Sequence, residues 1–321
     1  MKKQLITNGD RWYKANLHCH STVSDGKMTV EALAEAYRKE GYQIVAFTDH
    51  RKLIPHPELN REDFLALTSV ELDGSDRRDE NKKYRPTYHL NFFARKADET
   101  DLSFYDQDYM KKHYGPDAWN ELIAKVSDRF LVQYNHPRWS LQDIRDFGPL
   151  EGLWGFEVFN TGCEEVMLNG WGEEEYIQML REGKMLIPTA TDDNHDTHPI
   201  GEPKNDSFGG FTMIQAKALT QEAVIAAMEK GDCYASTGPV IKELWAEDGV
   251  VHAETSGVCC ICLRGPGYST KHERAHGDTL THAEFELSAF KEVPEFLYLE
   301  VADTYGKKAI TRAFLQQEWE E

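Results

Sequence analysis

Short apolar runs alternate with amphipathic segments through the first two-thirds of this 321-residue chain, and this alternation constrains the fold more than any other feature. It predicts strand–helix–strand units around a parallel sheet. Several of the runs are apolar without polar alternation, which is typical of strands that are covered on both faces. We expect strands at residues 12–18, 43–48, 64–70, 88–94, 130–135, 155–160, 184–191 and 211–216.

The segment that joins the first two expected strands has the signals of a helix. Thr29 can cap it, apolar residues recur at positions 30, 33, 34 and 37, and Gly41 can end it. Eight strands with intervening helices predict an α/β fold that closes, or nearly closes, into a β/α barrel. Further helices are expected at residues 117–128, 173–182 and 220–230, with a short one that starts at Ser140 and has Asp143 as its capping-box partner.

The pattern changes after Gly238 and Pro239, where β-like runs follow one another closely with turn residues between them. We therefore predict a barrel domain at residues 1–240 and a small β-rich, sandwich-like domain at residues 241–321. The expected strands of this tail are residues 240–246, 250–254, 258–263, 283–290 and 296–302.

The charge balance limits the partners that the chain can bind. It has 36 Lys and Arg against 55 Asp and Glu, a formal net charge of −19. Nucleic-acid binding normally depends on clustered cations, so this balance argues against a nucleic-acid polymer. An anionic small molecule would have to be attracted by bound ions and nearby Arg or Lys.

Residues 1–10 are polar and no apolar run is long enough to cross a membrane, so we expect a cytoplasmic protein without a membrane partner. The six cysteines lack paired C-x-x-C spacing and lie mostly in apolar runs. This predicts reduced, buried thiols. The sequence predicts no oligomeric state.

Histidines and carboxylates recur where the expected strands end. His18 and His20 are two residues apart on one strand, so both imidazoles project from one face and can reach one ion. An isolated His-x-His pair is more often incidental than ligating. In a β/α barrel, however, the carboxyl ends of the strands meet at one mouth. The residues that follow the other strands are Asp25, His50, Glu71, His136 and residues 192–195.

His89 does not follow this rule directly. It lies near the start of its apolar run, so it reaches the mouth only if that strand is offset or short. Imidazole and carboxylate together suit Zn, Mn or Fe rather than Ca or Mg, which prefer oxygen ligands. The competing interpretation, that each histidine is a core or surface residue satisfied by backbone groups, holds for a single histidine more readily than for the set.

These motifs follow one another in the chain: Leu17-His18-Cys19-His20, Ser24-Asp25-Gly26, Phe47-Thr48-Asp49-His50, Glu71, His89, Asn135-His136-Pro137 and Asp193-Asn194-His195. In this order and spacing they resemble the motifs of the polymerase-and-histidinol-phosphatase (PHP) phosphoesterases, over residues 11–240. Residues 233–239 and the β-rich tail are more loosely similar to the carbaryl-hydrolase-like branch of that superfamily.

The resemblance implies a distorted (β/α)7 barrel of the PHP type, similar to a TIM barrel, and two or three divalent ions of Zn, Mn or Fe. Glu71 would bridge a trinuclear site, and Asp25, Glu71 and His195 would be catalytic. The Asp-x-His motif selects Asp193, while the adjacent Asp192 is left open as a ligand or as a partner of one. The implied ligands are His18, His20, Glu71 and Asp193 for one ion, Asp25, His50 and His195 for a second, and Glu71, His89 and His136 for a third.

The resemblance further implies a metal-dependent phosphoric ester hydrolase, in which a metal-bridging hydroxide attacks a small phosphorylated molecule. Two alternatives stay open: a carbamate, ester or amide hydrolase on the same site, and a non-catalytic metal-binding module. Each expected substrate contact has a structural alternative, a carboxylate ion pair for Arg or Lys and a helix or turn cap for Asn. These contacts are Arg138, Arg51, Asn160 and Lys217.

We predict no role in the site for two further groups of residues. The tail histidines are treated as solvated side chains, despite the i, i+4 spacing of His272 and His276. Tryptophans can line a substrate pocket but are more often core residues. The residues concerned are His252, His272, His276 and His282, and among the tryptophans Trp139, Trp154 and Trp171.

Overall fold

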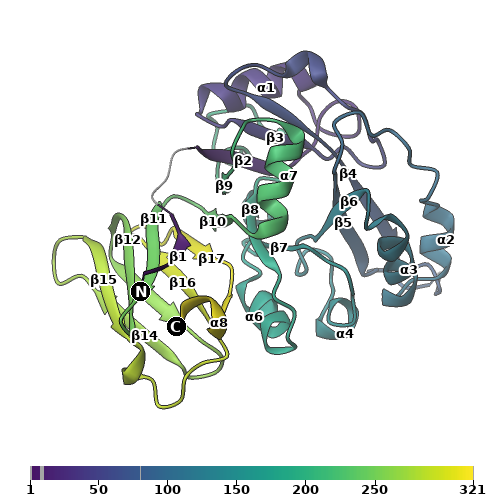
Figure 1. Cartoon of the computed structure of the whole chain (residues 1–321). Coiled ribbons are helices and arrows are strands. Elements are labelled where there is room, and N and C mark those ends of the chain that lie inside the picture. Colours follow the sequence, from purple (N-terminus) through teal and green to yellow (C-terminus); the bar gives the residue numbers. More distant parts are fainter. Residues whose placement is uncertain (1, 8–10, 80, 321) are drawn as a thin grey trace.

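The computed structural model describes residues 2–7, 11–79 and 81–320, which form two parts (Figure 1). The larger part has strands at its centre and helices around them, and the smaller part consists mostly of strands. The ends of the predicted domains, residues 1 and 321, lie outside the described residues. Among the described residues, none of the helices combines the length and the apolar composition that crossing a bilayer requires.

Each of the eight strands expected in the larger part is present there. α1 (Val30–Lys39) begins after Thr29, whose side chain accepts a hydrogen bond from the N–H of Ala32. The strands of this part are β2 (Trp12–Cys19), β3 (Ile44–Phe47), β4 (Leu65–Ser75), β5 (Thr87–Ala94), β6 (Phe130–Tyr134), β7 (Gly155–Asn160), β8 (Ile187–Thr191), β9 (Phe211–Gln215) and β10 (Cys233–Ser236). The other helices are a 3-10 turn (Pro57–Leu59), α2 (Gln107–Lys112), α3 (Pro116–Val126), α4 (Ile144–Phe147), α5 (Thr161–Met167), α6 (Glu173–Arg181) and α7 (Gln221–Lys230).

One short helix begins later than the sequence predicts. Asp143, and not Ser140, is the N-cap of α4, and Asp146 completes its capping box. The hydroxyl of Ser140 instead lies 3.2 Å from Nδ1 of His136. Ser140 therefore orients a candidate ligand rather than starting a helix.

The sheet of the larger part is mixed, so the expectation of a wholly parallel sheet is wrong. β2, β3 and β4 are parallel, as are β6, β7 and β8, but β5 is antiparallel to both β4 and β6. β9 is antiparallel to β2, with Trp12 opposite Gln215 and Ala15 opposite Thr212. β5 is reversed because a hairpin, and not a crossover helix, joins it to β4.

The structure does not show the closed barrel that the sequence predicts. Within the described residues, the strand ladder ends at β8, which pairs along its length with β7. To close a barrel, β8 would have to pair with β2, but β9 already pairs with the first half of β2. β8 and β2 are linked at one rim, where the N–H of Asp193 donates to the carbonyl of His18 and the N–H of His20 donates to that of Asn194. The fold is therefore described as a mixed α/β fold.

The smaller part consists of two sheets with a shared core. One sheet has the order β1-β11-β12-β15, so the strand at the start of the chain pairs with the tail. The other sheet continues that of the larger part, since β17 pairs with β10. The elements are β1 (Lys3–Ile6), β11 (Ile241–Glu247), β12 (Val250–Val258), β13 (Cys260–Arg264), β14 (Thr270–Arg274), β15 (Leu280–Glu286), a 3-10 turn (Leu287–Ala289), β16 (Phe296–Ala302), β17 (Lys308–Thr311), β18 (Phe314–Leu315) and α8 (Gln316–Trp319).

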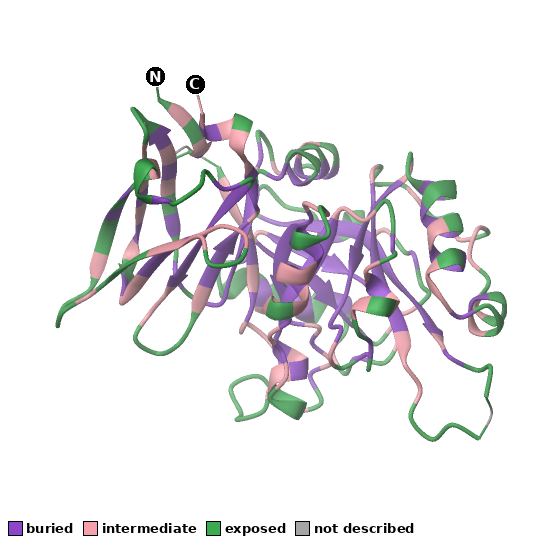
Figure 2. Ribbon diagram, turned by 90° about the horizontal axis from the view of Figure 1, so that it is seen from below, coloured by how far each residue is buried: buried purple, intermediate pink, exposed green. Residues whose placement is uncertain are grey.

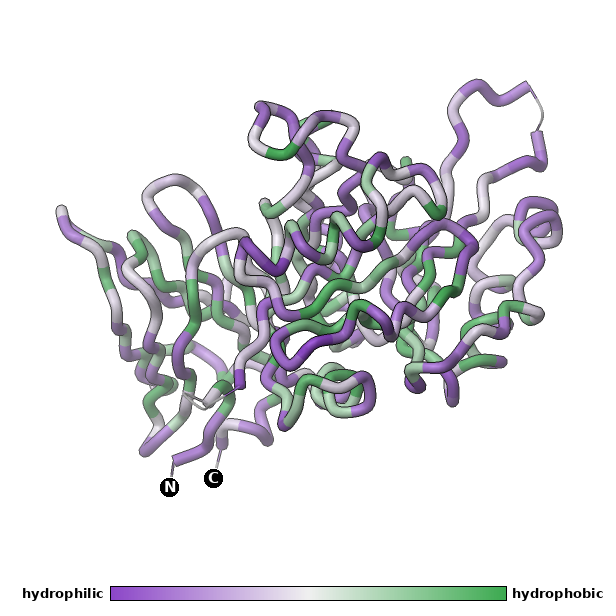
Figure 3. The backbone as a smooth tube through the Cα atoms, turned by 90° about the horizontal axis from the view of Figure 1, so that it is seen from above, coloured by the Kyte–Doolittle hydropathy of each residue, from purple (hydrophilic) through white to green (hydrophobic). Residues whose placement is uncertain are grey.

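Buried residues lie mainly on the central strands of both parts, while the helices turn exposed residues outward (Figure 2). Hydrophobic stretches run through the interior and the outer loops are mostly hydrophilic (Figure 3). All six cysteines are free thiols, and four of them are buried. Most of the interior is thus hydrophobic. The larger part nevertheless contains buried polar residues, and many of them lie at one rim of the sheet.

Candidate metal centre

The nine predicted ligands converge at the rim where β2, β3, β4, β6 and β8 end. A cavity of about 260 Å³ opens there. Seven of the nine ligands line it, and His18 and His20 lie beneath them as fully buried side chains. The lining residues are Asp25, His50, Glu71, His89, His136, Trp139, Gly162, Cys163, Val166, Asp193, His195, Thr197 and Asp206.

His89 reaches this rim because β5 is reversed. The first residues of an antiparallel strand lie beside the last residues of its neighbour, and His89 is opposite Asp73 near the end of β4. Its Nδ1 atom is 3.0 Å from Oε1 of Glu71. No offset or shortening of the strand is needed to bring His89 to the site.

A tightly fixed loop presents Asp25. The buried carboxylate of Asp49 accepts hydrogen bonds from the main-chain N–H groups of Ser21 and Ser24 at 2.8 and 3.1 Å, and from both hydroxyls. A Cβ atom on Gly26 would lie 2.3 Å from the carbonyl oxygen of His20, so this turn requires glycine. Asp49 and Gly26 thereby fix the position from which Asp25 reaches the site.

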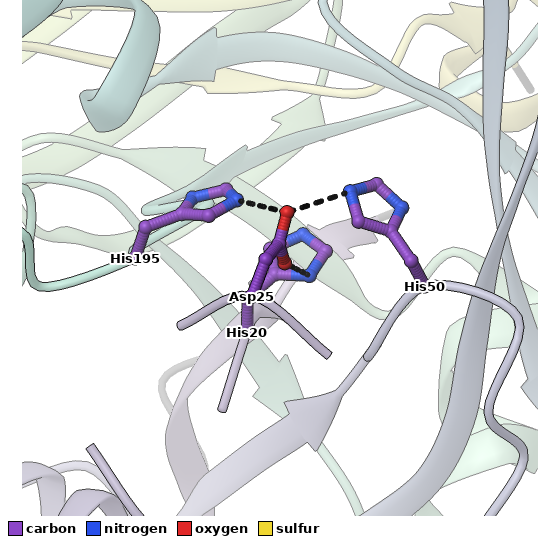
Figure 4. Close-up of side chains that lie close together, drawn as sticks. All are labelled: His20, Asp25, His50 and His195. Carbon is purple, nitrogen blue, oxygen red and sulfur yellow. Dashed lines mark ion pairs between the residues drawn. The ribbon is translucent and has the colours of Figure 1, made fainter. Parts of the chain in front are cut away.

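Asp25 forms the first group of potential ligands with three histidines (Figure 4). Its carboxylate oxygens lie 3.8 Å from Nδ1 of His20, 3.7 Å from Nε2 of His50 and 3.6 Å from Nε2 of His195. One potential ligand atom from each of the four residues lies within 4.8 Å of the others. The family resemblance implied Asp25, His50 and His195 as the ligands of the second ion, and this group adds His20 to them.

Two carboxylates are each shared by several imidazoles. Oε1 of Glu71 lies 3.3 Å from His18 and 3.0 Å from His89, and Oε2 lies 3.4 Å from His20 and 3.0 Å from His50. Asp193 is similarly placed, with Oδ1 3.1 Å from His18 and 3.0 Å from His20 and with Oδ2 3.7 Å from His136. The sequence pattern suggested a shared position for Glu71 alone.

The polar atoms at the centre of this cluster lack hydrogen-bond partners. Buried polar groups are nearly always paired, yet Nε2 of His18, both ring nitrogens of His20, Nδ1 of His50 and Oε2 of Glu71 are buried without one. Imidazole nitrogens and carboxylate oxygens are the donors that divalent Zn, Mn or Fe prefer. The residues present therefore fit bound divalent cations.

The close packing of imidazoles and carboxylates shifts their pKa values in opposite directions. Burial lowers the pKa of His18, but Asp193, Glu71 and Glu157 outweigh it and hold that pKa well above its usual value. Burial raises the pKa of Glu71, yet the surrounding imidazoles His89, His18 and His50 hold it well below the usual range. The carboxylates are thus favoured in the ionised form that a metal ligand requires.

Glu157 on β7 supports the cluster from beneath and was not predicted. Its Oε1 lies 2.8 Å from Nδ1 of His18, and its Oε2 accepts a hydrogen bond of 2.9 Å from the N–H of His136. A buried carboxylate that orients a ligating imidazole is a common feature of metal sites. The available signal was a charged residue within the apolar strand of residues 155–160, since a buried charge needs a partner.

The two adjacent aspartates have different surroundings. Asp193 has a φ of 52°, in the left-handed region that favours glycine, and its carboxylate faces the imidazoles. Asp192 instead accepts hydrogen bonds from Tyr37, Thr161 and the main-chain N–H groups of residues 208–210, at 2.7 to 2.9 Å. Burial raises the pKa of Asp192 to about 6. The geometry therefore favours Asp193 as the ligand and gives Asp192 a role in holding the loop.

Two of the expected substrate contacts are engaged elsewhere. Arg138 donates to Glu175 at 2.8 Å and does not line the cavity. Arg51 pairs with Asp73 beside a second hollow that also borders Asp25 and His50. Of these two arginines, Arg51 lies nearer to the site, although its charge is paired with that of Asp73.

Asn160 takes the helix-cap position that the sequence left open, whereas Lys217 is placed differently from the expectation. Asn160 is fully buried, caps α5 through the N–H of Cys163, and donates to Asp193 at 3.0 Å, so it orients a ligand rather than a substrate. Lys217 follows β9, which is antiparallel to β2. It therefore lies at the opposite end of the sheet from the site, since the end of β9 is beside Trp12.

Trp139 is the tryptophan that lines the cavity. Its ring packs edge-on against His89 and His136, with centroids 5.3 and 5.2 Å apart, and 42% of the residue is exposed. Val166 on α5, 76% exposed, is a second apolar lining residue. Trp154 and Trp171, by contrast, are partly buried against the core.

Comparison with known proteins finds a family match for a segment of the α/β part. Residues 16–137 match the model of the PHP domain. A curated relative, the DNA polymerase/3'-5' exonuclease PolX of Bacillus subtilis, is 49% identical over 41 residues, which are 13% of this chain and 7% of that protein. The shared segment is thus a small part of PolX.

A solved structure covers more of the chain at lower identity. It is a two-domain protein from Bacteroides vulgatus described as containing a predicted PHP-like metal-dependent phosphoesterase. It is 15% identical, the alignment covers 97% of this chain and 98% of that one, and the TM-score is 0.47. Neither relative is described as a carbaryl hydrolase, so the expected resemblance of the tail to that branch stays a prediction.

Proposed function

We propose that this chain, whose residues 16–137 match a PHP domain, is a metal-dependent hydrolase that cleaves the phosphate ester of a small molecule. The observation that carries the proposal is the cluster of buried, unpaired imidazole and carboxylate atoms around Glu71 and Asp193. The cavity over this cluster gives a substrate access to it, which favours an enzyme over a non-catalytic metal-binding module.

Three groups of residues would hold two or three ions of Zn, Mn or Fe. Bound divalent ions would supply an activated water and polarise a phosphoryl oxygen. Glu71 and Asp193, each close to several imidazoles, would be shared between the bound ions, and Glu157 would orient the imidazole of His18. The proposed groups are His20, Asp25, His50 and His195; His18, His136 and Asp193; and Glu71 with His50 and His89.

The residues of the cavity wall suit the organic part of a substrate. Trp139 and Val166 present apolar surface beside the imidazoles. The hydroxyl of Thr197 also lines the cavity and can accept a hydrogen bond from a substrate hydroxyl. The carboxylate of Asp206 already accepts the main-chain N–H groups of His195 and Asp196 and holds that loop. The chain therefore positions a substrate that has an apolar group next to its reacting bond.

A carbamate, ester or amide is the second candidate, and one observation favours it. Among the described residues that line the cavity, none is a lysine or an arginine. A neutral substrate does not need such a cation, whereas a phosphate would depend on the ions and imidazoles for charge. The same hydrolytic chemistry serves both classes.

Metal analysis followed by a substrate panel tests the proposal. Protein purified without chelator should contain two or three equivalents of Zn, Mn or Fe that are lost on substitution of Glu71 or Asp193, as measured by elemental analysis. With that metal supplied, it should release inorganic phosphate from small phosphomonoesters or phosphodiesters. Cleavage of aryl carbamates without any phosphate release would replace the first candidate by the second, and a metal-loaded protein inactive on both panels would contradict both.

A further inference from the structure

The sheet β1-β11-β12-β15 belongs to the smaller part (Figure 1). Three potential metal ligands from β12 and β15 meet on one of its faces. His252 on β12 is directly opposite Glu284 on β15. His282 is two residues before Glu284 on the same strand, so both project from the same face. The strand register therefore brings two imidazoles and one carboxylate together.

The distances within this cluster match those of a small tetrahedral cation site. Oε1 of Glu284 lies 3.3 Å from Nδ1 of His252 and 3.2 Å from Nε2 of His282. With bonds of about 2.0–2.1 Å to Zn²⁺, two ligand atoms of a tetrahedron are about 3.3 Å apart. One ligand atom from each residue already lies within 4.8 Å of the others, so an ion would fit with little rearrangement.

The ring of His252 is held in place by Trp245. These residues are directly opposite each other on β11 and β12. Their rings stack with an interplanar angle of 5° and centroids 4.8 Å apart, and Nζ of Lys2 lies 4.1 Å from the Trp245 ring centroid. A ligand whose orientation is fixed by its neighbours loses less freedom when it binds an ion.

We propose that His252, His282 and Glu284 form a second divalent-cation site. It is separate from the candidate metal centre around Glu71 and Asp193, which we call the PHP centre. Two imidazoles and one carboxylate select Zn²⁺, Ni²⁺ or Cu²⁺ rather than Ca²⁺ or Mg²⁺. His282 is 43% and Glu284 61% exposed in their side chains, so an ion has access from solvent and keeps positions for water. Because β15 is the last strand of its sheet, a bound ion would tie this edge strand to β12.

The simpler interpretation is that the imidazoles donate hydrogen bonds to Glu284 with no metal involved. The two interpretations differ in the number of ions that the protein holds. The PHP-centre ligands all lie outside the tail, so a tail variant should remove one equivalent and leave the others bound. This test does not depend on whether the proposed hydrolase activity is found.

Equilibrium dialysis of the full chain against buffered Zn²⁺ tests the site. His282→Ala should hold one equivalent of Zn²⁺ less than the wild type at concentrations that saturate the wild type, or bind that ion about 10- to 100-fold more weakly. His276→Ala, an exposed tail histidine outside the cluster, is the matched control and should bind as the wild type does. Far-UV circular dichroism checks that both variants are folded.

Trp245 provides a second readout that is local to the cluster. Cu²⁺ quenches the fluorescence of a tryptophan that it approaches closely. Titrating Cu²⁺ into protein that is already loaded at its PHP centre should therefore quench the part of the fluorescence that comes from Trp245. The Trp245→Phe variant should lack this quenching. His282→Ala should lose the same quenching. Equal Zn²⁺ content and equal quenching in wild type and His282→Ala would overturn the proposal.

Discussion

The Nδ1 atom of His18 lies 2.8 Å from Oε1 of Glu157, and both side chains are fully buried. A carboxylate at this distance favours the tautomer with the hydrogen on Nδ1, which leaves the lone pair of Nε2 free. That Nε2 atom faces Glu71 and Asp193 at 3.3 and 3.1 Å. Glu157 thus sets the direction in which His18 can bind an ion, although it is not itself among the proposed ligands.

Glu157→Gln should weaken metal binding while leaving every proposed ligand in place. The amide oxygen can still accept from His18 and Thr191, but the amide lacks the charge. Its NH₂ group cannot accept the hydrogen bonds that Oε2 now receives from the N–H of His136 and the side chain of Asn160. Loss of such a supporting partner typically costs 10–100-fold in metal affinity. Dialysis against buffered metal measures this loss. Glu165→Gln, at an exposed position on α5, is the control, and equal affinities in both variants would contradict the role of Glu157.

The adjacent aspartates should respond differently to the same substitution. Asp193→Asn should lose metal and activity but stay folded, because its carboxylate faces the imidazoles. Asp192→Asn should lower the free energy of unfolding by about 1–3 kcal/mol, because an amide cannot accept all the hydrogen bonds that hold residues 208–210. Urea titration and elemental analysis of both variants check this. Metal loss with unchanged stability in Asp192→Asn would reverse the assignment.

The sequence predicts the strands of this fold better than their directions. Apolar runs indicate β5 and β9 because burial determines their composition, but pairing direction depends on the connection between strands and leaves little trace in composition. His89 could be recognised as a ligand by its type but not placed, since its position follows from the reversal of β5. The same limit misplaced Lys217, which follows the antiparallel strand β9.

Side-chain partners at the site were harder to predict than the ligands. His18 and His20 stand out because spacing on a strand fixes their shared face. Arg138 follows the His136-Pro137 motif, yet its preference for Glu175 depends on α6, which lies far along the chain. Contacts of this kind are decided by packing between elements, which local sequence does not encode.

Trp139→Ala should reduce selectivity for substrates with an aromatic group, provided that the chain hydrolyses phosphate esters. Trp139 lines the cavity beside His89 and His136, and an aromatic contact contributes about 0.5–1.5 kcal/mol. We expect kcat/KM for an aryl phosphate to fall about 3- to 10-fold, with that for methyl phosphate unchanged. Leu141→Ala, an exposed apolar neighbour that does not line the cavity, is the control. An equal loss on both substrates would contradict a role in selectivity.

The two parts of the chain are joined by a partly buried group of charges. Nζ of Lys308 on β17 lies 2.6 Å from Glu173 on α6 and 3.1 Å from Glu300 on β16. Arg264 also pairs with Glu300. Burial and the neighbouring Glu300 raise the pKa of Glu173. A single ammonium group therefore separates two carboxylates at the contact between the parts.

Lys308→Met should destabilise the chain by about 1–3 kcal/mol at neutral pH, because it leaves the carboxylates of Glu173 and Glu300 facing each other in a poorly hydrated contact. The loss should shrink as the pH falls. Without the ammonium group, the pKa of Glu173 in the folded state rises further above its pKa in the unfolded state. At pH values between the two, the native state binds more protons than the unfolded state. Acidification through this range therefore stabilises the native state. Urea unfolding of Lys308→Met and of Lys307→Met, an exposed neighbour, at pH 7.5 and pH 5.5 measures both effects. A loss that is equal at both pH values would mean that Lys308 contributes packing rather than charge.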